Sequence, residues 1–492
     1  MLTRRSAILG AAALAAGGSA YVGQARARTD PRTRLPVPAL LDARARDHAV
    51  ELAARAGQHA FQAGVPAPSY GFSASYLGPT LLLRRGDETR FTIRNELREL
   101  TTVHWHGAIV SGAVDGGPHN SIAPDGEWRP TFKLDQPPAT LWYHAHPHGA
   151  TALQVYRGLA GLLLVSDDGD AARGLPHDYG VDDLPLVLQD RAFGRDGSLA
   201  YDRSPMATMM GMLGDTIIVN GAVASFAPVP KGMTRLRLLN GSNARILRLG
   251  FDDQRVFHVI ASDGGYLAAP TQLKDLMLAP GERCEILVDF ADGKSCALQS
   301  LPHTIGARSS GMPMMQMMQA GPERAEFIMQ FEPDAALPAA VREAPSKLDG
   351  PGAPDASKVA TRRDAVLQPM LGGMGMMGMM RGGGRMGVNG RSFDMNRIDF
   401  EAKLGTSEIW TVRSEMMAHP FHIHGTSFRI LSIDGAPPPA HLAGLKDVVL
   451  VEGVVELLVP FNAAAGKDHP FMTHCHILEH EDAGMMAQFV VT

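Results

Sequence analysis

The sequence predicts an all-β protein made of three consecutive sandwich or barrel domains. The chain has 492 residues, which is enough for about three domains. It contains 53 glycines and 34 prolines, a composition that is typical of many turns between short strands. Short runs rich in β-branched residues alternate with these turn residues, for example at 80–84, 216–219, 234–239, 285–290 and 408–413.

Two changes in composition divide the chain into these domains. An Ala-, Pro- and Asp-rich stretch over 333–361 is typical of a linker, and a weaker change occurs over 167–183. We therefore expect a signal peptide over 1–27, a lead segment over 28–65, domains over 66–168, 180–332 and 362–492, and a linker over 333–361.

The first residues have the pattern of an export signal. Arg4 and Arg5 precede an Ala- and Gly-rich apolar stretch, and Ala25-Arg26-Ala27 fits a small-x-small cleavage site. The paired arginines indicate the twin-arginine route, and an ordinary secretory signal is the alternative. The apolar stretch is too short to span a bilayer, and no later stretch is long enough. We therefore expect a periplasmic protein without a membrane span.

Charge and cysteine content exclude two classes of protein. With 46 Lys and Arg against 51 Asp and Glu, the net charge is −5, so no basic excess is present to bind nucleic acid. Three cysteines are too few for a disulfide-based scaffold in a chain of this length.

Local patterns predict one weak helix and two hairpins. The Ala-rich residues 47–61 favour a helix, and residues 80–84 and 89–94 flank the turn signal Arg-Gly-Asp-Glu. A second hairpin would turn at 292–293 and would place Cys284 and Cys296 on opposite faces. We therefore expect these two cysteines to be free thiols.

Histidine is concentrated in four short clusters, two in the first predicted domain and two in the last. Residues two apart on a strand point to the same face, so each His-x-His pair offers two imidazoles to one site. Imidazole suits copper, zinc, iron and nickel. The pairs are His104 and His106, His144 and His146, His422 and His424, and His474 and His476.

A second metal site is indicated by Cys475, which lies between the last two of these histidines. Its thiolate faces away from the site that its neighbours share. His419 and His480 are left over from the four pairs, and Met485 follows five residues after His480. Two His, one Cys and a distant Met form the ligand set of a blue-copper electron-transfer centre.

The four clusters resemble the four copper-ligand motifs of multicopper oxidases, in the family's order. His-Trp-His-Gly and Trp-Tyr-His-x-His match the first domain, and His-Pro-x-His-x-His-Gly and His-Cys-His-x-x-x-His-x-x-x-x-Met match the last. The resemblance covers nearly all of 65–492 and implies three cupredoxin-like Greek-key β-sandwich domains, the middle one a copper-free spacer. It also implies four copper ions per chain. The implied ligands are His419, Cys475, His480 and Met485 for type 1 copper, His104 and His422 for type 2, and His106, His144, His146, His424, His474 and His476 for the type 3 pair.

The resemblance also implies an oxidase. A reductant gives up single electrons at the type 1 copper, and the trinuclear cluster between the first and last domains reduces O₂ to water. Asp115 and Glu481 match two family acids that help to deliver protons. The alternatives are a turn-forming role for Asp115 and a solvated charge for Glu481.

Methionine is unusually abundant, with 26 residues, many of them in clusters over 206–212, 312–318 and 370–386. Thioether sulfur prefers Cu(I), and a core does not need such clusters because methionine specifies packing poorly. Apolar filler or a flexible loop is the alternative.

This methionine pattern is similar to that of bacterial periplasmic copper-resistance oxidases, which oxidise Cu(I). In that subgroup a Met-rich insert in the third domain lies over the type 1 site. The subgroup usually has Asp where Glu415 stands, and its insert is often His-rich, whereas this one has no histidine. The match implies a substrate Cu(I) site formed by Glu415, Met417, Met374 and Met376.

We therefore expect a monomeric oxidase that couples Cu(I) oxidation to O₂ reduction and detoxifies copper, with O₂ and Cu(I) or a small reductant as its partners. The alternatives are a laccase-like oxidase of phenols or aromatic amines, a ferroxidase, and a non-enzymatic cell-division scaffold or copper store. An open type 1 site favours a laccase, and a Met-covered one opposes it. Scaffold relatives lose copper ligands, whereas this chain retains all of them.

Overall fold

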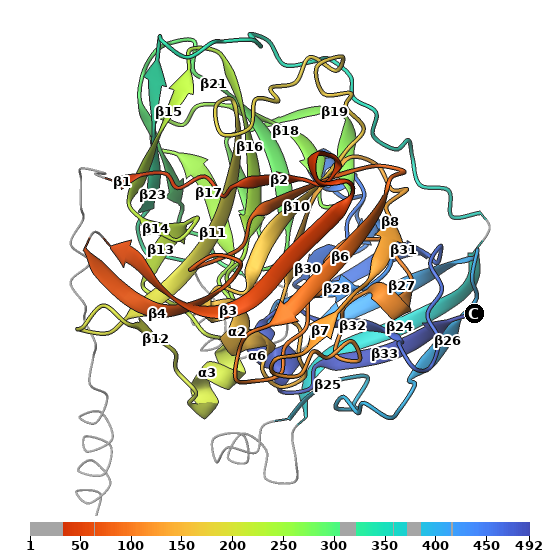
Figure 1. The fold of residues 1–492 in the computed structure, drawn as a ribbon. Helices are drawn as coiled ribbons and strands as arrows, with labels where there is room; N and C mark the ends of the chain where they lie inside the picture. Colours follow the sequence, from red (N-terminus) through yellow and green to blue (C-terminus); the bar gives the residue numbers. More distant parts are fainter. Residues whose placement is uncertain (1–32, 63, 306–320, 358, 371–384, 415–416) are drawn as a thin grey trace, which may run out of the picture. The chain divides into compact units, whose positions relative to one another are not determined.

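The computed structural model describes residues 33–62, 64–305, 321–357, 359–370, 385–414 and 417–492 (Figure 1). Strands dominate this part of the chain and form six sheets, which confirms the predicted all-β class. No described helix is long and apolar enough to cross a membrane, and the longest, α2, has 7 residues. The predicted signal peptide, Glu415, Met374 and Met376 lie outside the described residues.

Two sheets form the first predicted domain, in red to yellow in Figure 1. Their inward side chains share one core that includes Leu81, Phe91 and Trp105. One sheet has the order β2 (Leu40–Asp42), β5 (Thr80–Arg84), β10 (Ala160–Ser166) and β9 (Ala139–His144); the other has β4 (Val65–Phe72), β3 (Ala49–Gln62), β6 (Glu88–Asn95), β7 (Glu127–Trp128) and β8 (Thr131–Lys133).

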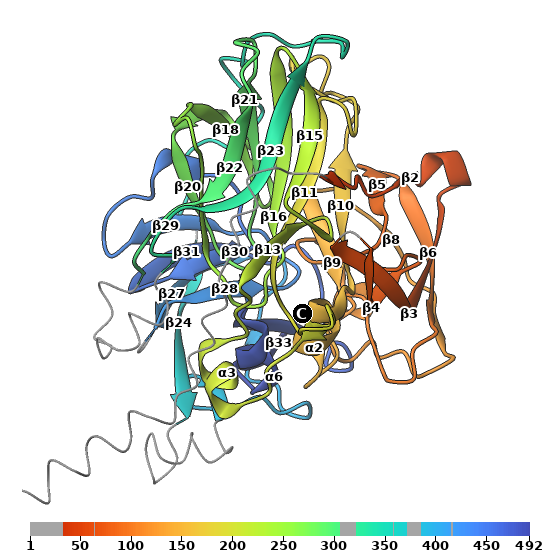
Figure 2. The ribbon, with the colours of Figure 1, turned by 90° about the vertical axis from the view of Figure 1, so that its left-hand side faces the viewer.

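Two further sheets form the middle domain, whose strands are mostly green in Figure 2. One sheet contains β1 (Thr33–Arg34), β15 (Ser225–Pro230), β23 (Glu326–Asp334), β22 (Cys296–Ser300), β17 (Leu247–Phe251) and β20 (Asp275–Leu278). The other contains β14 (Ala222–Val223), β13 (Thr216–Val219), β11 (Asp183–Phe193), β16 (Met233–Asn240), β21 (Arg283–Asp289), β18 (Phe257–Ser262), β19 (Gly265–Leu273) and β12 (Leu199–Ala200).

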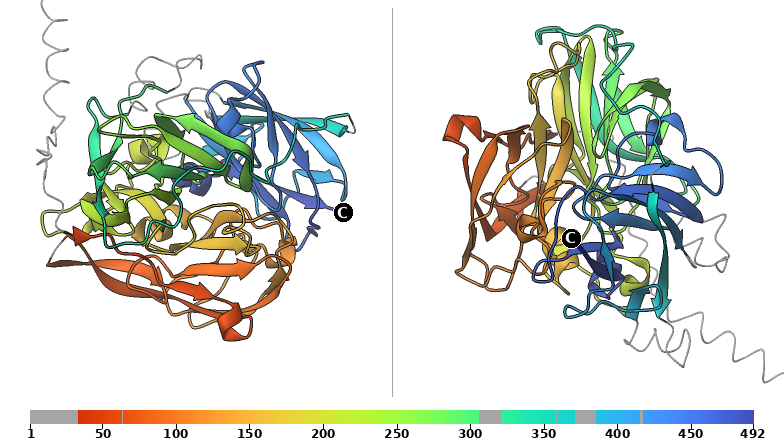
Figure 3. Two further views of the ribbon diagram at one scale, coloured as in Figure 1. Left: turned by 90° about the horizontal axis from the view of Figure 1, so that it is seen from above. Right: turned by 90° about the vertical axis from the view of Figure 1, so that its right-hand side faces the viewer.

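The last domain, in blue in Figure 3, also consists of two sheets. Residues 335–357, in the predicted linker, form no strand or helix before it. Its first sheet has the order β25 (Arg385–Val388), β24 (Val359–Met370), β27 (Ser407–Ser414), β31 (Val454–Pro460) and β29 (Arg429–Ile433). Its second has β26 (Phe400–Ala402), β33 (Met486–Val491), β32 (Phe471–Cys475), β28 (His419–Ile423) and β30 (Val448–Val451).

Short helices lie in the connections between these strands. The α-helices are α2 (Thr151–Arg157), α3 (Pro205–Met210) and α6 (Leu478–Asp482), and they lie next to one another in Figure 2. Single turns of 3₁₀ helix are η1 (Arg44–Arg46), η2 (Gly112–Val114) and η4 (Ala440–Leu442).

The predicted helix over 47–61 is wrong, because most of this segment belongs to strand β3. Val50, Leu52 and Ala54 are buried and alternate with more exposed residues, which is the period of a strand. Pairing with β4 on one side and β6 on the other overrides the helix propensity of the alanines.

Both predicted hairpins are wrong for one reason. β5 and β6 lie in different sheets, and so do β21 and β22. In each case the turn leads the chain across the sandwich, so the two strands face each other through the core instead of pairing along their edges. The thiols of Cys284 and Cys296 are nevertheless free and buried, which confirms that part of the prediction.

Candidate metal centre

The fold brings the four histidine clusters together between the first and last domains. His104 is bridged to His144 at the end of β9, and His422 on β28 pairs with His474 on β32. Strand pairing thus places the two clusters of the first domain side by side, and likewise the two clusters of the last domain. All eight paired imidazoles are at most 1% exposed.

Their ring nitrogens form three groups in which all ligand atoms lie within 4.8 Å of one another. Stacked rings support this arrangement: His106 lies 3.7 Å from His422 and His104 lies 3.9 Å from His424, centroid to centroid. The groups are His104, His106 and His422; His106, His144 and His476; and His146, His424 and His474.

Hydrogen bonds orient the two rings predicted for type 2 copper. The Nδ1 atoms of His104 and His422 lie 2.9 and 2.8 Å from the backbone oxygens of Asp115 and Asp447. A carbonyl oxygen only accepts, so each Nδ1 carries the proton and each Nε2 keeps its lone pair. Both Nε2 atoms are buried without a hydrogen-bond partner among the described residues. Such buried, unpartnered lone pairs fit a metal ion.

Three of the remaining rings follow the same rule and His106 is an exception, whereas the ring nitrogens of His146 and His476 have no hydrogen-bond partner among the described residues. Nδ1 of His144 and of His474 donates to a backbone oxygen at 2.9 and 3.0 Å, and Nδ1 of His424 contacts Asp115 Oδ2 at 2.8 Å. His106 instead uses Nε2, which donates to Asp447 Oδ1 at 3.0 Å. Its Nδ1 therefore faces the cluster, 3.4 Å from His144 Nε2.

Burial favours the neutral form of several of these rings by lowering their pKa values. Burial lowers the pKa of His474 to about 3. Burial is also the main cause, with neighbouring imidazoles second, of the pKa lowering of His106, His146, His422 and His424. A neutral imidazole is the form that binds a metal ion, so the site is ready to bind one at neutral pH.

A second, smaller group consists of His419, Cys475 and His480. The Nδ1 atoms of both histidines lie 3.6 Å from Cys475 Sγ, and all three side chains are buried. Met485 is fully buried in the same core, and its backbone oxygen accepts a hydrogen bond from the Cys475 amide at 3.1 Å. Sulfur and imidazole donors in this combination fit a blue-copper centre.

Comparisons with known proteins identify the chemistry of this donor set. Family profiles described as multicopper oxidase match residues 53–170, 194–297 and 360–492. Multicopper oxidase mco from Staphylococcus haemolyticus is 38% identical over 428 residues, which cover 85% of this chain and 83% of that protein. The chain belongs to the multicopper oxidase family.

Other relatives differ in their described roles. A solved bacterial laccase-like multicopper oxidase, CueO from Ochrobactrum sp., has oxidase activity towards lignin model compounds and lignosulfonate. It is 44% identical, with a TM-score of 0.85, and the match covers 93% of this chain and 100% of that one. Cell division protein FtsP from Salmonella typhimurium is 36% identical over 481 residues, which cover 97% of this chain and 96% of that protein.

As a multicopper oxidase, the protein is an enzyme that binds copper and transfers electrons from a reducing substrate to O₂. The three imidazole groups and the Cys475 group present nitrogen and sulfur donors of the kind that suit copper. His148, which extends the second motif, lies outside these groups and packs edge-on against Phe393 at 5.1 Å.

Helix α3 of the middle domain covers the Cys475 group of this oxidase. His480 Nε2 donates to the backbone oxygen of Met209 at 2.9 Å, and His480 is 0% exposed. Met209 and Met210 are buried in the core that also contains Cys475, whereas Met206 on the same helix is exposed. Of the predicted substrate-site residues, only Met417 is described; it is buried two residues before His419.

Two buried carboxylates, Asp115 and Glu481, contact imidazoles of the eight-histidine cluster. Asp115 is buried against His424, and Glu481 lies with its two oxygens 3.2 Å from His146 Nδ1 and 3.3 Å from His474 Nδ1. Burial raises the pKa of Glu481 well above its usual value, and the neighbouring Asp482 raises it further. Glu481 is 1% exposed, so it is not the solvated surface charge that was its alternative.

Sequence reasoning missed Asp447, which contacts two of the imidazoles. A detectable signal was present, since Lys446 and Asp447 are two charges directly before the apolar strand β30. Both are buried, and such burial requires partners that local sequence does not reveal.

Proposed function

We propose that this oxidase uses Cu(I) as its electron donor and protects the periplasm from copper. The observation that carries the proposal is the closure of the Cys475 group. His419 is 1% exposed and His480 is 0% exposed, and the outer nitrogen of His480 is occupied by the Met209 carbonyl. A flat aromatic donor therefore has no open imidazole to approach, whereas a single ion among sulfur ligands needs little space.

We assign one type 1, one type 2 and two type 3 copper ions to the chain. When bound, these ions supply one-electron storage and the four-electron reduction of O₂ to water. The type 3 assignment is supported by two separate groups of three imidazoles each. The residues are His419, Cys475, His480 and Met485 for type 1, His104 and His422 for type 2, His106, His144 and His476 for one type 3 ion, and His146, His424 and His474 for the other.

The chain's own residues connect the two sites and supply protons. Cys475 lies between His474 and His476 in the sequence, so only a short covalent path separates the thiolate from two trinuclear ligands. Asp115 and Glu481 hold carboxyl groups beside imidazoles, where they can pass protons to oxygen. The overall reaction consumes four Cu(I), one O₂ and four protons and gives four Cu(II) and two waters.

Glu415, Met417, Met374 and Met376 are the proposed substrate site. A carboxylate with thioethers suits Cu(I) and disfavours harder ions. Met417 lies two residues before His419 in the sequence, so an ion held there lies near a proposed type 1 ligand.

A laccase-like function is the second candidate. It is favoured by the 44% identity to the Ochrobactrum sp. enzyme and by that enzyme's activity towards lignin model compounds. A cell-division role, suggested by the FtsP relatives, has less support, because this chain retains a full set of buried copper donors.

Oxygen uptake by the copper-loaded enzyme distinguishes these functions. We expect kcat/KM for Cu(I) to exceed that for 2,6-dimethoxyphenol by at least about tenfold. The Cys475→Ser variant serves as the control, because it removes the thiolate and is expected to abolish both activities. A phenol rate above the Cu(I) rate would establish the laccase-like function instead.

A further inference from the structure

One turn of the middle domain reaches the histidines that we assign to the trinuclear cluster. This turn, residues 280–283, leads into strand β21. At Gly281 φ is +82°, and a Cβ atom there would lie 2.9 Å from ring atoms of His476. Only glycine therefore allows the imidazole to rest directly on the backbone of the middle domain.

Arg283, at the end of the same turn, contacts all three domains. Its Nε donates to the backbone oxygen of Thr140 on β9 at 3.1 Å. One Nη1 and one Nη2 hydrogen go to backbone oxygens of Gly281 and Asp263, each at 3.1 Å. The other two bind the Asp447 carboxylate in a bidentate pair, each at 2.5 Å. All five N–H donors of the guanidinium are thus used in a fully buried position.

Asp447 transmits this contact to two imidazoles. Its Oδ1 accepts from His106 Nε2, and its backbone oxygen accepts from His422 Nδ1. The carboxylate is what makes His106 present Nδ1 to the cluster, in contrast to its neighbours. At Gly107, where φ is +86°, a Cβ atom would lie 2.6 Å from both Arg283 Nη2 and Asp447 Oδ2, so the ion pair packs directly against the backbone that follows His106.

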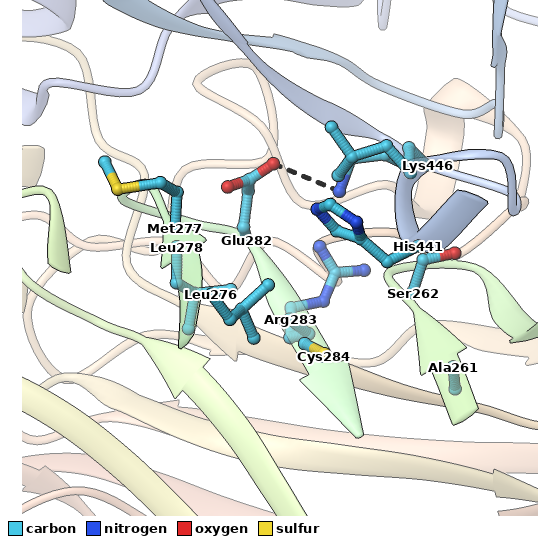
Figure 4. Close-up of a pocket in the computed structure, with 11 residues that line it drawn as sticks. Ala261, Ser262, Leu276, Met277, Leu278, Glu282, Arg283, Cys284, His441 and Lys446 are labelled. Atoms are coloured by element: carbon cyan, nitrogen blue, oxygen red, sulfur yellow. Dashed lines mark ion pairs between the residues drawn. The ribbon is translucent and has the colours of Figure 1, made fainter. Parts of the chain in front are cut away.

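Further ion pairs hold the outer side of Arg283, where Figure 4 shows a small pocket between the middle and last domains. Lys446 Nζ lies 3.0 Å from both Asp263 Oδ2 and Glu282 Oε1, and the Glu282 contact is the dashed line in Figure 4. Asp263 Oδ1 also accepts from the Arg283 amide at 2.8 Å. Every member of this network is buried and paired.

We infer that the middle domain positions the trinuclear ligands, with Arg283 and Gly281 as the positioning residues. Arg283 fixes Asp447, which fixes the tautomer and orientation of His106 and His422, while Gly281 supports His476. The inference rests on the copper assignment proposed above. It gives the middle domain a role beyond that of a spacer, because outer partners of metal-binding histidines control metal affinity.

The test compares Arg283→Lys and Gly281→Ala with a matched control, Arg237→Lys. Arg237 is a second buried arginine of the middle domain, whose bidentate pair with Asp183 has both distances at 2.7 Å, and it contacts no proposed copper ligand. For each copper-loaded protein we would measure bound copper, the electron paramagnetic resonance spectrum of type 2 copper, the near-ultraviolet absorption of the type 3 pair, and the blue thiolate absorption of type 1 copper.

Both test variants are expected to retain the blue absorption. Arg283→Lys should lose type 2 copper to a chelator at least about tenfold more readily than wild type and should change the type 2 spectrum, because Asp447 orients the proposed type 2 ligand His422. Gly281→Ala should lose type 3 copper at least about tenfold more readily, because Gly281 supports the proposed type 3 ligand His476. Unchanged copper retention in Gly281→Ala and in folded Arg283→Lys would overturn the inference, as would an equal loss in Arg237→Lys. If Arg283→Lys does not fold, the type 3 copper retained by Gly281→Ala decides. A wild-type protein that shows no type 2 signal would contradict the copper assignment itself.

Discussion

In the copper-free protein, the free energy of unfolding should depend on pH, because imidazoles are buried in their neutral form. In the apoprotein, burial lowers the pKa of His480 from 6.5 to about 4, and its hydrogen bond to the Met209 carbonyl only partly offsets this. The unfolded chain therefore binds a proton on this residue at a higher pH than the folded chain does. Stability contributed by the neutral ring is present above about pH 6.5 and is lost progressively as the pH falls towards about 4.

The size of this effect follows from the two pKa values. Between about pH 7.5 and about pH 5, protonation of His480 in the unfolded state alone lowers the free energy of unfolding by about 2 kcal/mol. Buried carboxyl groups such as Asp482, whose pKa burial raises to about 7, act in the opposite direction. A His480 variant retains these carboxyl groups, so its comparison with wild type separates the contribution of His480 from theirs.

Urea unfolding of the apoprotein followed by circular dichroism is the assay. Apo His480→Gln should lose about 2 kcal/mol less stability than apo wild type over this pH range. His258→Gln changes a histidine outside the metal groups and should behave as wild type. Equal pH dependence in wild type and His480→Gln would refute the view that this ring is buried in its neutral form.

Three further outcomes are expected. Glu481→Gln should lower kcat for O₂ reduction by about 10² or more, while stopped-flow reduction of the blue centre keeps its rate; a normal kcat would exclude Glu481 from proton delivery. Cys475→Ser should lack the blue absorption yet retain three of the four proposed copper ions, and loss of all copper would mean that the two sites do not form independently. The thiols of Cys284 and Cys296 should react with Ellman's reagent only after unfolding, and a mass that shows a disulfide between them would contradict their free state.

The histidine and cysteine groups that we propose as copper donors could be predicted from sequence because their arrangement is local. In His-x-His pairs the strand period alone brings two imidazoles to one side, and the Cys475 motif combines both sites within a few residues. The strands themselves were also visible as short apolar runs. Sequence could not show which strands pair, because a turn such as 85–87 is equally compatible with a hairpin and with a crossing between sheets.

Contacts between residues far apart in the sequence were the second feature that could not be predicted. Arg283 and Asp447 are 164 positions apart, and their ion pair depends on the way three domains meet. Similarly, the carbonyl of Met209 contacts His480 across 271 positions, so no local pattern could assign helix α3 to the Cys475 group. The conformation of strand β3 could not be predicted for a related reason, since its pairing with two neighbouring strands determines it.

The most direct test of Cu(I) oxidation is oxygen uptake by a chain in which residues 371–384 are replaced by Asn-Gly. Met370 pairs with Arg385 at the ends of β24 and β25, so a two-residue hairpin turn can join the strands there. The account predicts that Cu(I)-driven uptake falls at least about tenfold while phenol-driven uptake is unchanged or rises. An unchanged rate with Cu(I) would contradict the proposal that the methionine segment delivers the substrate.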